Sequence, residues 1–119
     1  MTKKFIVETI GTFRQIHVVE AETEAKQAAT KYFQEKLGGV DQFACGFAWV
    51  DILGIKGSTK LGRAMTAAGV RKSYTGAFQI WNPSNLGVQN IDTLEAGAEA
   101  AAKVFEKYGF RAYAGSRLD

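Results

Sequence analysis

The chain has 119 residues, of which 46% are hydrophobic, and its formal net charge at pH 7 is +3. This length and apolar content indicate one domain over residues 1–119, with residues 1–3 and 116–119 as short tails. The sequence has no apolar run of about 18 residues and therefore predicts no membrane-spanning helix. One cysteine and one histidine cannot form an internal disulfide or a Cys/His zinc site, so we expect a cytoplasmic protein without metal or cofactor.

The first part of the chain has the pattern of a β-hairpin followed by a helix. Residues 4–10 and 12–20 are rich in β-branched and aromatic residues on either side of Gly11, which predicts two strands. The first helix is expected to begin near Thr23, which can cap it, and to end at the glycine pair 38–39.

A nearly continuous apolar run follows at residues 43–52. Small residues alternate with aromatic ones in this run, a pattern that predicts a central strand buried on both faces. Asp51 lies near the carboxyl end of this strand, where open sheets gather ligand groups. We expect Asp51 to pair with Lys56 or to orient a ribose hydroxyl.

A short helix and a further strand are predicted next. Ser58 can cap a helix over residues 59–68, and Gly69 can end it in the left-handed conformation. Residues 72–81 alternate apolar and polar side chains, which predicts a strand that the turn signal at 82–85 ends.

The last helix has the clearest pattern in the sequence. Asp92 and Glu95 have the spacing of a capping box, and one apolar stripe runs from Leu94 to Tyr108. A final strand is expected at residues 110–114. The order β-β-α-β-α-β-α-β predicts an α/β or α+β domain with a mixed sheet of about five strands and three helices.

The charge of the chain is concentrated in its centre. Between Ile52 and Ile91 there are five basic residues and no acidic one, so this segment carries +5. The 51 residues before residue 52 and the 28 after residue 91 each sum to −1. Charge separated in this way indicates an anionic partner.

Residues 57–64 have the glycine spacing of the phosphate-binding loop of nucleoside triphosphatases. Arg63 and Ala64 occupy the positions where that loop needs its lysine and its magnesium-binding hydroxyl, which argues against such an enzyme. What remains is a helix start with free amides and nearby cations, which suits a phosphate or carboxylate. The alternative is an ordinary capped helix with a solvated basic face.

Aromatic residues close to this charge suit the stacking of a nucleobase. Tyr74 and Trp81 lie at expected strand ends, where a ring can meet solvent, and Arg117 in the tail is expected to close over the site. We predict no catalytic residues, and the sequence favours a binding protein over an enzyme without excluding catalysis. The predicted ligand-binding residues are Lys56, Ser58, Thr59, Lys60, Arg63, Tyr74, Trp81 and Arg117.

Four segments carry a resemblance to a known group of proteins: GFAWV (46–50), KGSTKLG (56–62), IWNPS (80–84) and AYAGSRLD (112–119). Over residues 30–119 the chain resembles small proteins encoded by tailed bacteriophages, a group with no assigned activity. The resemblance implies a phage accessory protein, for example one that counters host defence, and it carries over no site residue.

These observations favour a non-enzymatic protein that sequesters a small anionic ligand in the host cytoplasm, either a nucleotide or a nucleotide-derived immune signal. One alternative is a nucleic-acid-binding protein that uses the basic segment 56–72. A second alternative is a protein-protein inhibitor of a host factor. Because sheet edges favour assembly, we also expect a homo-oligomer.

Overall fold

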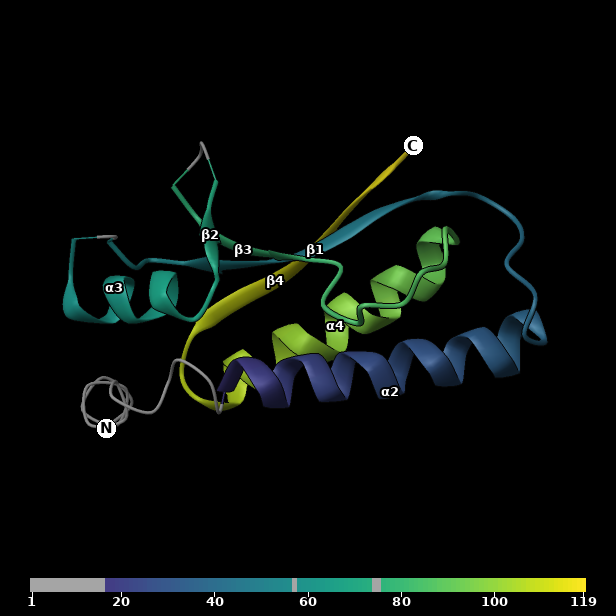
Figure 1. Ribbon diagram of the computed structural model, residues 1–119, viewed down its shortest axis with the longest axis horizontal. Coiled ribbons are helices and arrows are strands. Elements are labelled where there is room, and N and C mark those ends of the chain that lie inside the picture. Colours follow the sequence, from purple (N-terminus) through teal and green to yellow (C-terminus); the bar gives the residue numbers. More distant parts are fainter. Residues whose placement is uncertain (1–16, 57, 74–75) are drawn as a thin grey trace.

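The computed structural model describes residues 17–56, 58–73 and 76–119. These residues form an α+β domain, which confirms the predicted fold class (Figure 1). The elements are α2 (Val18–Leu37), β1 (Gly46–Leu53), α3 (Lys60–Ala67), β2 (Arg71–Lys72), β3 (Phe78–Trp81), α4 (Ile91–Lys107) and β4 (Arg111–Leu118).

The four described strands form one sheet in the order β2-β3-β1-β4. Every neighbouring pair is antiparallel, so the sheet is not mixed as expected. The single strand predicted over 72–81 is two strands, β2 and β3, which pair with each other. β4 continues to Leu118, so residues 116–118 belong to the sheet and not to a tail. Self-association remains a prediction.

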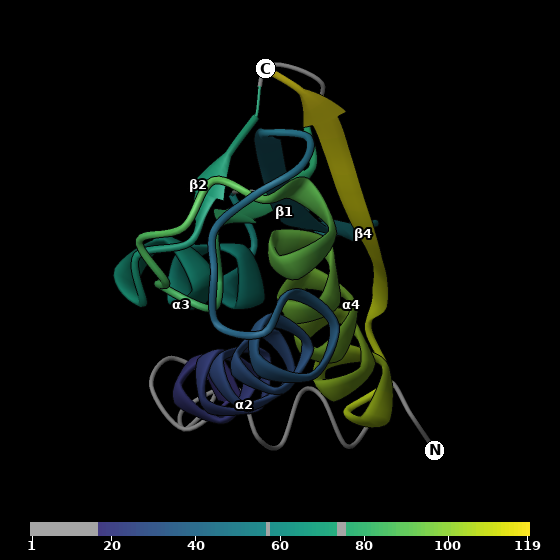
Figure 2. The same ribbon diagram turned by 90° about the vertical axis from the view of Figure 1, so that its right-hand side faces the viewer.

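The helices lie on one side of the sheet. α4 packs against β1 and β4, and α2 packs against the far side of α4 (Figures 1 and 2). α3 lies beside β2, beyond one end of α4 (Figure 1). No helix of the described residues covers the opposite face of the sheet, which we call the open face.

Burial alternates along β1. Its core-facing side chains are small or aliphatic and fully buried, among them Ala48, Val50 and Ile52. The residues between them, such as Phe47 and Trp49, face away from α4 and are exposed or half-buried. The prediction that this strand is buried on both faces was therefore wrong, because α4 covers only one of them.

The start of α4 is held by residues from a distant loop. Asn90, not Asp92, caps the helix, and its Oδ1 accepts the backbone N–H of Thr93 at 2.8 Å. The Asn90 side chain also donates to the carbonyl of Gln42 at 2.8 Å, and Asp41 accepts the Asn90 backbone N–H at 3.0 Å. The apolar stripe of the helix is buried as predicted, at Leu94, Ala98, Ala101 and Phe105.

The first turn of α2 occupies positions that the sequence assigns to a strand. His17 is buried and its ring lies 4.0 Å from that of Tyr108, between centroids. Glu20 accepts hydrogen bonds from Tyr108 Oη, at 2.6 Å, and from Lys107. These contacts with the end of α4 hold residues 18–20 in a helix, against their local β propensity. The remainder of the expected hairpin, at residues 4–16, lies outside the described residues.

Gly97 sets the distance between α2 and α4. A Cβ at this position would lie 3.0 Å from Ser84 Cβ and 3.2 Å from the Ala25 carbonyl oxygen. We expect Gly97→Leu to lower the free energy of unfolding by about 1–3 kcal/mol, because the larger side chain has no room. Urea denaturation measures the loss. Lys103→Leu, at an exposed site of the same helix, should change stability by less than about 0.5 kcal/mol. Equal losses in the two variants would contradict this packing.

Stability should decline as the pH is lowered below about 6.5. Burial lowers the pKa of His17 from its usual 6.5, an effect that the carboxylate of Glu20 partly opposes. The unfolded chain then binds this proton at a higher pH than the folded chain, so stability is complete above pH 6.5 and declines below it. Thermal unfolding of His17→Phe, which keeps a ring against Tyr108, should show a flatter slope in this range.

Two carboxyl groups nearby are present both in the original protein and in His17→Phe. Hydrogen bonds from Lys107 and Tyr108 lower the pKa of Glu20, whereas burial raises the pKa of Glu22. The difference between the two melting curves therefore reports the imidazole together with its charge interaction with Glu20. Identical slopes for the original protein and for His17→Phe would show that His17 does not couple protonation to folding.

Candidate functional site

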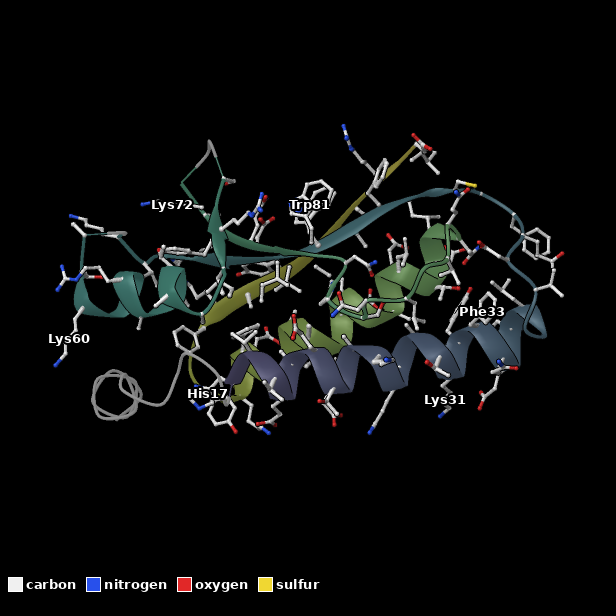
Figure 3. All side chains as sticks on the ribbon, in the orientation of Figure 1. His17, Lys31, Phe33, Lys60, Lys72 and Trp81 are labelled. Atoms are coloured by element: carbon white, nitrogen blue, oxygen red, sulfur yellow. The ribbon has the colours of Figure 1, made fainter. Side chains whose placement is uncertain are left out.

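Three aromatic side chains lie together on the open face of the sheet: Phe47 and Trp49 from β1, and Trp81 from β3. We call them the aromatic platform. Trp49 and Trp81 are cross-strand partners, and their ring centroids lie 4.7 Å apart at an interplanar angle of 31°. Phe47 meets Trp81 edge to face at 6.3 Å. Figure 3 shows Trp81 projecting from the sheet, away from α2 and α4.

The platform meets solvent. Trp81 is 47% exposed and Phe47 is 39% exposed. A single exposed apolar residue needs no explanation, but grouped large rings on an uncovered face indicate a contact surface.

Gln79 and Asp51 hold the two indoles in place. Trp81 Nε1 donates to Gln79 Oε1 at 3.0 Å, and Gln79 Nε2 donates to Asp51 Oδ1 at 2.7 Å. Trp49 Nε1 donates to Asp51 Oδ2 at 3.1 Å. The contacts of this carboxylate within the described residues are thus with the platform and its support, and not with Lys56 as expected. Both ring orientations are set before any ligand arrives.

Gly115 allows the ring of Trp49 to lie down over β4. The two residues are cross-strand partners, and a Cβ at Gly115 would lie 2.5 Å from Trp49 Nε1. Any larger residue at this position would lift the indole off the sheet.

Arginines flank the platform on both sides. The Arg117 guanidinium lies 5.3 Å from the centroid of the Phe47 ring, a cation-π contact. Strand register places Arg111 of β4, opposite Leu53, and Arg71 of β2, opposite Gln79, on the same face. Among the described strand residues on this face, three are arginines and Asp51 is the only acid, so the face is positive.

The structure brings together two of the residues that the sequence proposed for ligand binding. Trp81 and Arg117 come from different strands, and both contact Phe47. Tyr74 lies outside the described residues.

The other proposed residues lie at the start of α3. Thr59, not Ser58, caps this helix: its hydroxyl accepts the Gly62 backbone N–H at 3.1 Å and donates to the Lys56 carbonyl at 2.6 Å. The Arg63 guanidinium donates to the Ser58 carbonyl at 2.6 Å. Several predicted phosphate ligands are therefore already used to shape their own loop.

Lys60 is exposed on α3, far along the molecule from Trp81 (Figure 3). The predicted ligand residues thus form two separate groups, one at the start of α3 and one at the platform.

Phe47 and Trp49 are the residues that sequence reasoning missed. Their signal is the alternation of small and aromatic residues over 46–50, which places both rings on the same side of a strand. The hydrophobic character of the whole segment concealed it.

No described helix is long and apolar enough to cross a membrane. The described part of the chain also holds no group of three or more histidine, cysteine or acidic side chains placed to bind a metal ion. Comparisons with protein-family models, with curated proteins and with solved structures find no match. The candidate site therefore depends on its own geometry.

Gly115→Val should displace the ring of Trp49. We expect the near-ultraviolet circular dichroism of the tryptophan pair to be lost, and the free energy of unfolding to fall by about 1–3 kcal/mol. Ala114→Val, at the neighbouring exposed position of β4, should leave the spectrum unchanged. A tryptophan signal that survives in Gly115→Val would contradict the contact between Trp49 and β4.

Proposed function

We propose that this protein binds single-stranded nucleic acid on the open face of its sheet. The observation that carries the proposal is the exposed ring pair of Phe47 and Trp81, packed beside Trp49 and flanked by Arg117. Every base has an aromatic face, and each base stacked on a protein ring contributes about 1–3 kcal/mol. Guanidinium groups beside the rings suit the phosphates that link successive bases.

The shape of the site favours a single strand over a duplex. In a duplex the faces of the bases are stacked on one another, so protein rings can reach only unpaired bases. β1 and β3 are the two central strands of the sheet, and they carry all three rings of the platform. RNA-binding modules with a four-stranded sheet also stack two or three bases on sheet aromatics, an analogy of architecture alone.

The arginines give the strand a path across the sheet. Arg71 lies on one edge strand, and Arg111 and Arg117 lie on the other, with the rings between them. A chain of nucleotides crossing from β2 to β4 would place phosphates near both edges and bases over the centre. This arrangement differs from the expected use of the segment 56–72, since of its two residues in the described sheet Arg71 lies on this face and Lys72 on the other.

A second candidate function is the sequestration of a small nucleotide-type ligand. Trp81 and Arg117 converge on Phe47, which is enough for one base and one phosphate. In either case the resemblance to small bacteriophage proteins leads us to propose an accessory role in the host cytoplasm.

Trp81→Ala should weaken binding of a fluorescently labelled single strand of about ten nucleotides by about 5- to 150-fold. The loss of one stacked base is the physical reason, and fluorescence anisotropy with RNA and DNA strands measures it. Trp81→Phe should recover part of the affinity because it keeps an aromatic face.

Arg117→Gln should reduce the slope of log K against log salt by about 0.7, the share of one phosphate on a single strand.

Lys31→Gln is the matched control, because Lys31 is exposed on α2, away from the open face (Figure 3). It should change neither affinity nor salt slope by a comparable amount. If Lys60→Gln weakens binding while Trp81→Ala does not, the start of α3 is the site and the proposal is wrong. Competition by a mononucleotide, with a shallow salt slope, would favour sequestration of a small ligand. No response to any nucleotide or strand would favour inhibition of a host protein.

A further inference from the structure

A pocket opens at the end of the platform, where β3 leaves β1. Asn82 N donates to the Ala48 carbonyl at 2.9 Å, as the next step of the ladder that joins the two strands. Residues 83–88 then leave the strand, and the chain returns to β1 at Gln89, whose carbonyl accepts a hydrogen bond from Gly46 N at 3.0 Å. The pocket lined by residues of these segments has a volume of about 280 Å³.

The loop that encloses the pocket is internally bonded. Asn82 Nδ2 donates to the Leu86 carbonyl at 3.0 Å, and Ser84 Oγ donates to Asn82 Oδ1 at 2.9 Å. Ser84 Oγ also accepts the Leu86 backbone N–H at 3.3 Å, and the side chains of Pro83 and Ser84 are fully buried. The pocket is therefore formed in advance, which reduces the entropy lost on binding.

The walls of the pocket continue the platform. Phe47 and Trp81 line it on the side of the open face, and Leu86, Val88 and Leu94 add aliphatic surface. Its volume lies just under the range of about 300–1,000 Å³ that is usual for complete small-molecule sites. One base fits this space better than a whole nucleotide does.

The polar lining favours hydrogen-bond donors. Asp119 is the only charged residue among the described residues that line the pocket, and its backbone N–H is anchored on the Cys45 carbonyl at 3.1 Å. Gln89 Oε1 is an acceptor that faces Cys45 Sγ at 3.5 Å, and the Asn82 amide is engaged within the loop. A phosphate would meet a carboxylate here, whereas a base with N–H donors would find acceptors.

We propose that this pocket binds one guanine base of the strand that lies on the platform, an inference that rests on the proposed function. An ionised carboxylate accepts two parallel N–H bonds and donates none. Guanine carries two adjacent donors, N1–H and the N2 amino group, whereas adenine and cytosine place their amino group beside a ring acceptor. In uracil one imide N–H stands between two carbonyls. Asp119 therefore distinguishes guanine, while Phe47 and Trp81 hold the ring.

The test compares oligouridine strands that carry one central guanosine, inosine or adenosine. Inosine differs from guanosine only in lacking the N2 amino group, so it removes one of the two donors. The original protein should bind the guanosine strand about 5- to 150-fold more tightly than the inosine strand, as expected for a bidentate pair. Asp119→Asn should bring this ratio close to one.

Two further measurements use the pocket directly. Leu86→Trp fills the space and should abolish the preference for guanosine. This variant tests the pocket without changing the carboxylate of Asp119. Cys45 is the only cysteine of the chain and lines the pocket, so its alkylation by iodoacetamide, followed by mass spectrometry, reports occupancy. The guanosine strand should slow this reaction more than the inosine strand does. Glu99→Gln, at an exposed site on α4, is the control and should preserve the preference.

The outcomes separate the two proposals. If Trp81→Ala weakens every strand but the original protein binds guanosine and inosine strands equally, the guanine inference is wrong and the proposed function stands. If guanosine is preferred but Asp119→Asn and Leu86→Trp keep the preference, the base is read elsewhere and the inference is wrong. If Trp81→Ala leaves all affinities unchanged, the proposed function fails, and the inference fails with it.

Discussion

Packing of α4 between the sheet and α2 is the interaction on which the rest of the structure depends. Small residues make it possible: Gly97 meets the backbone of Ala25 on one side, and Ala98 and Ala101 are fully buried. Because α2 packs on α4 and not on the sheet, both long helices serve one face of the sheet only. No described helix covers the open face, so the side chains on that face must be compatible with contact with water.

The tryptophan pair meets this constraint and also suits a ligand. Cross-strand aromatic pairs stabilise antiparallel sheets, so Trp49 and Trp81 have a structural role whatever binds to them. Stabilisation alone does not require that both indole N–H groups be held by one chain of hydrogen bonds through Gln79 and Asp51. Nor does it require guanidinium groups at the edges. Rigid rings beside cations are a ready-made stacking surface, since little order is lost when a base arrives.

The sequence predicted the elements better than it predicted which faces they expose. The apolar stripe of α4 and the apolar run of β1 were sufficient to locate both, because burial leaves a periodic pattern. The same apolar run suggested a strand buried on both sides, and this concealed Phe47 and Trp49. Whether a helix covers the second face depends on contacts between distant segments, which local periodicity does not contain.

Long-range contacts also explain the other differences. Residues 18–20 favour a strand locally, but Glu20 is bound by Lys107 and Tyr108 at the far end of α4. Asn90 replaces Asp92 as a cap because Asp41 and Gln42 hold it in position. At the site, Trp81 and Arg117 were identifiable one by one, as an aromatic at a strand end and a cation near the carboxyl end of the chain. Their common partner, Phe47, required the strand register.

The excess charge of the central segment contributes less to the site than its size suggested. Arg63 is engaged with its own loop, and Lys60 lies far from the platform, so five positive charges close in sequence do not make one binding site. The open face is positive because arginines from β2 and β4 lie at its two edges. The pocket that Trp81 lines has Asp119 among its lining residues and no described cation. Phosphate and base would thus be separated by electrostatics: the arginines at the edges attract the backbone, and the acceptor in the pocket attracts a donor-bearing base and repels phosphate. A strand that binds in this way would be read at one position and held at the others without regard to sequence.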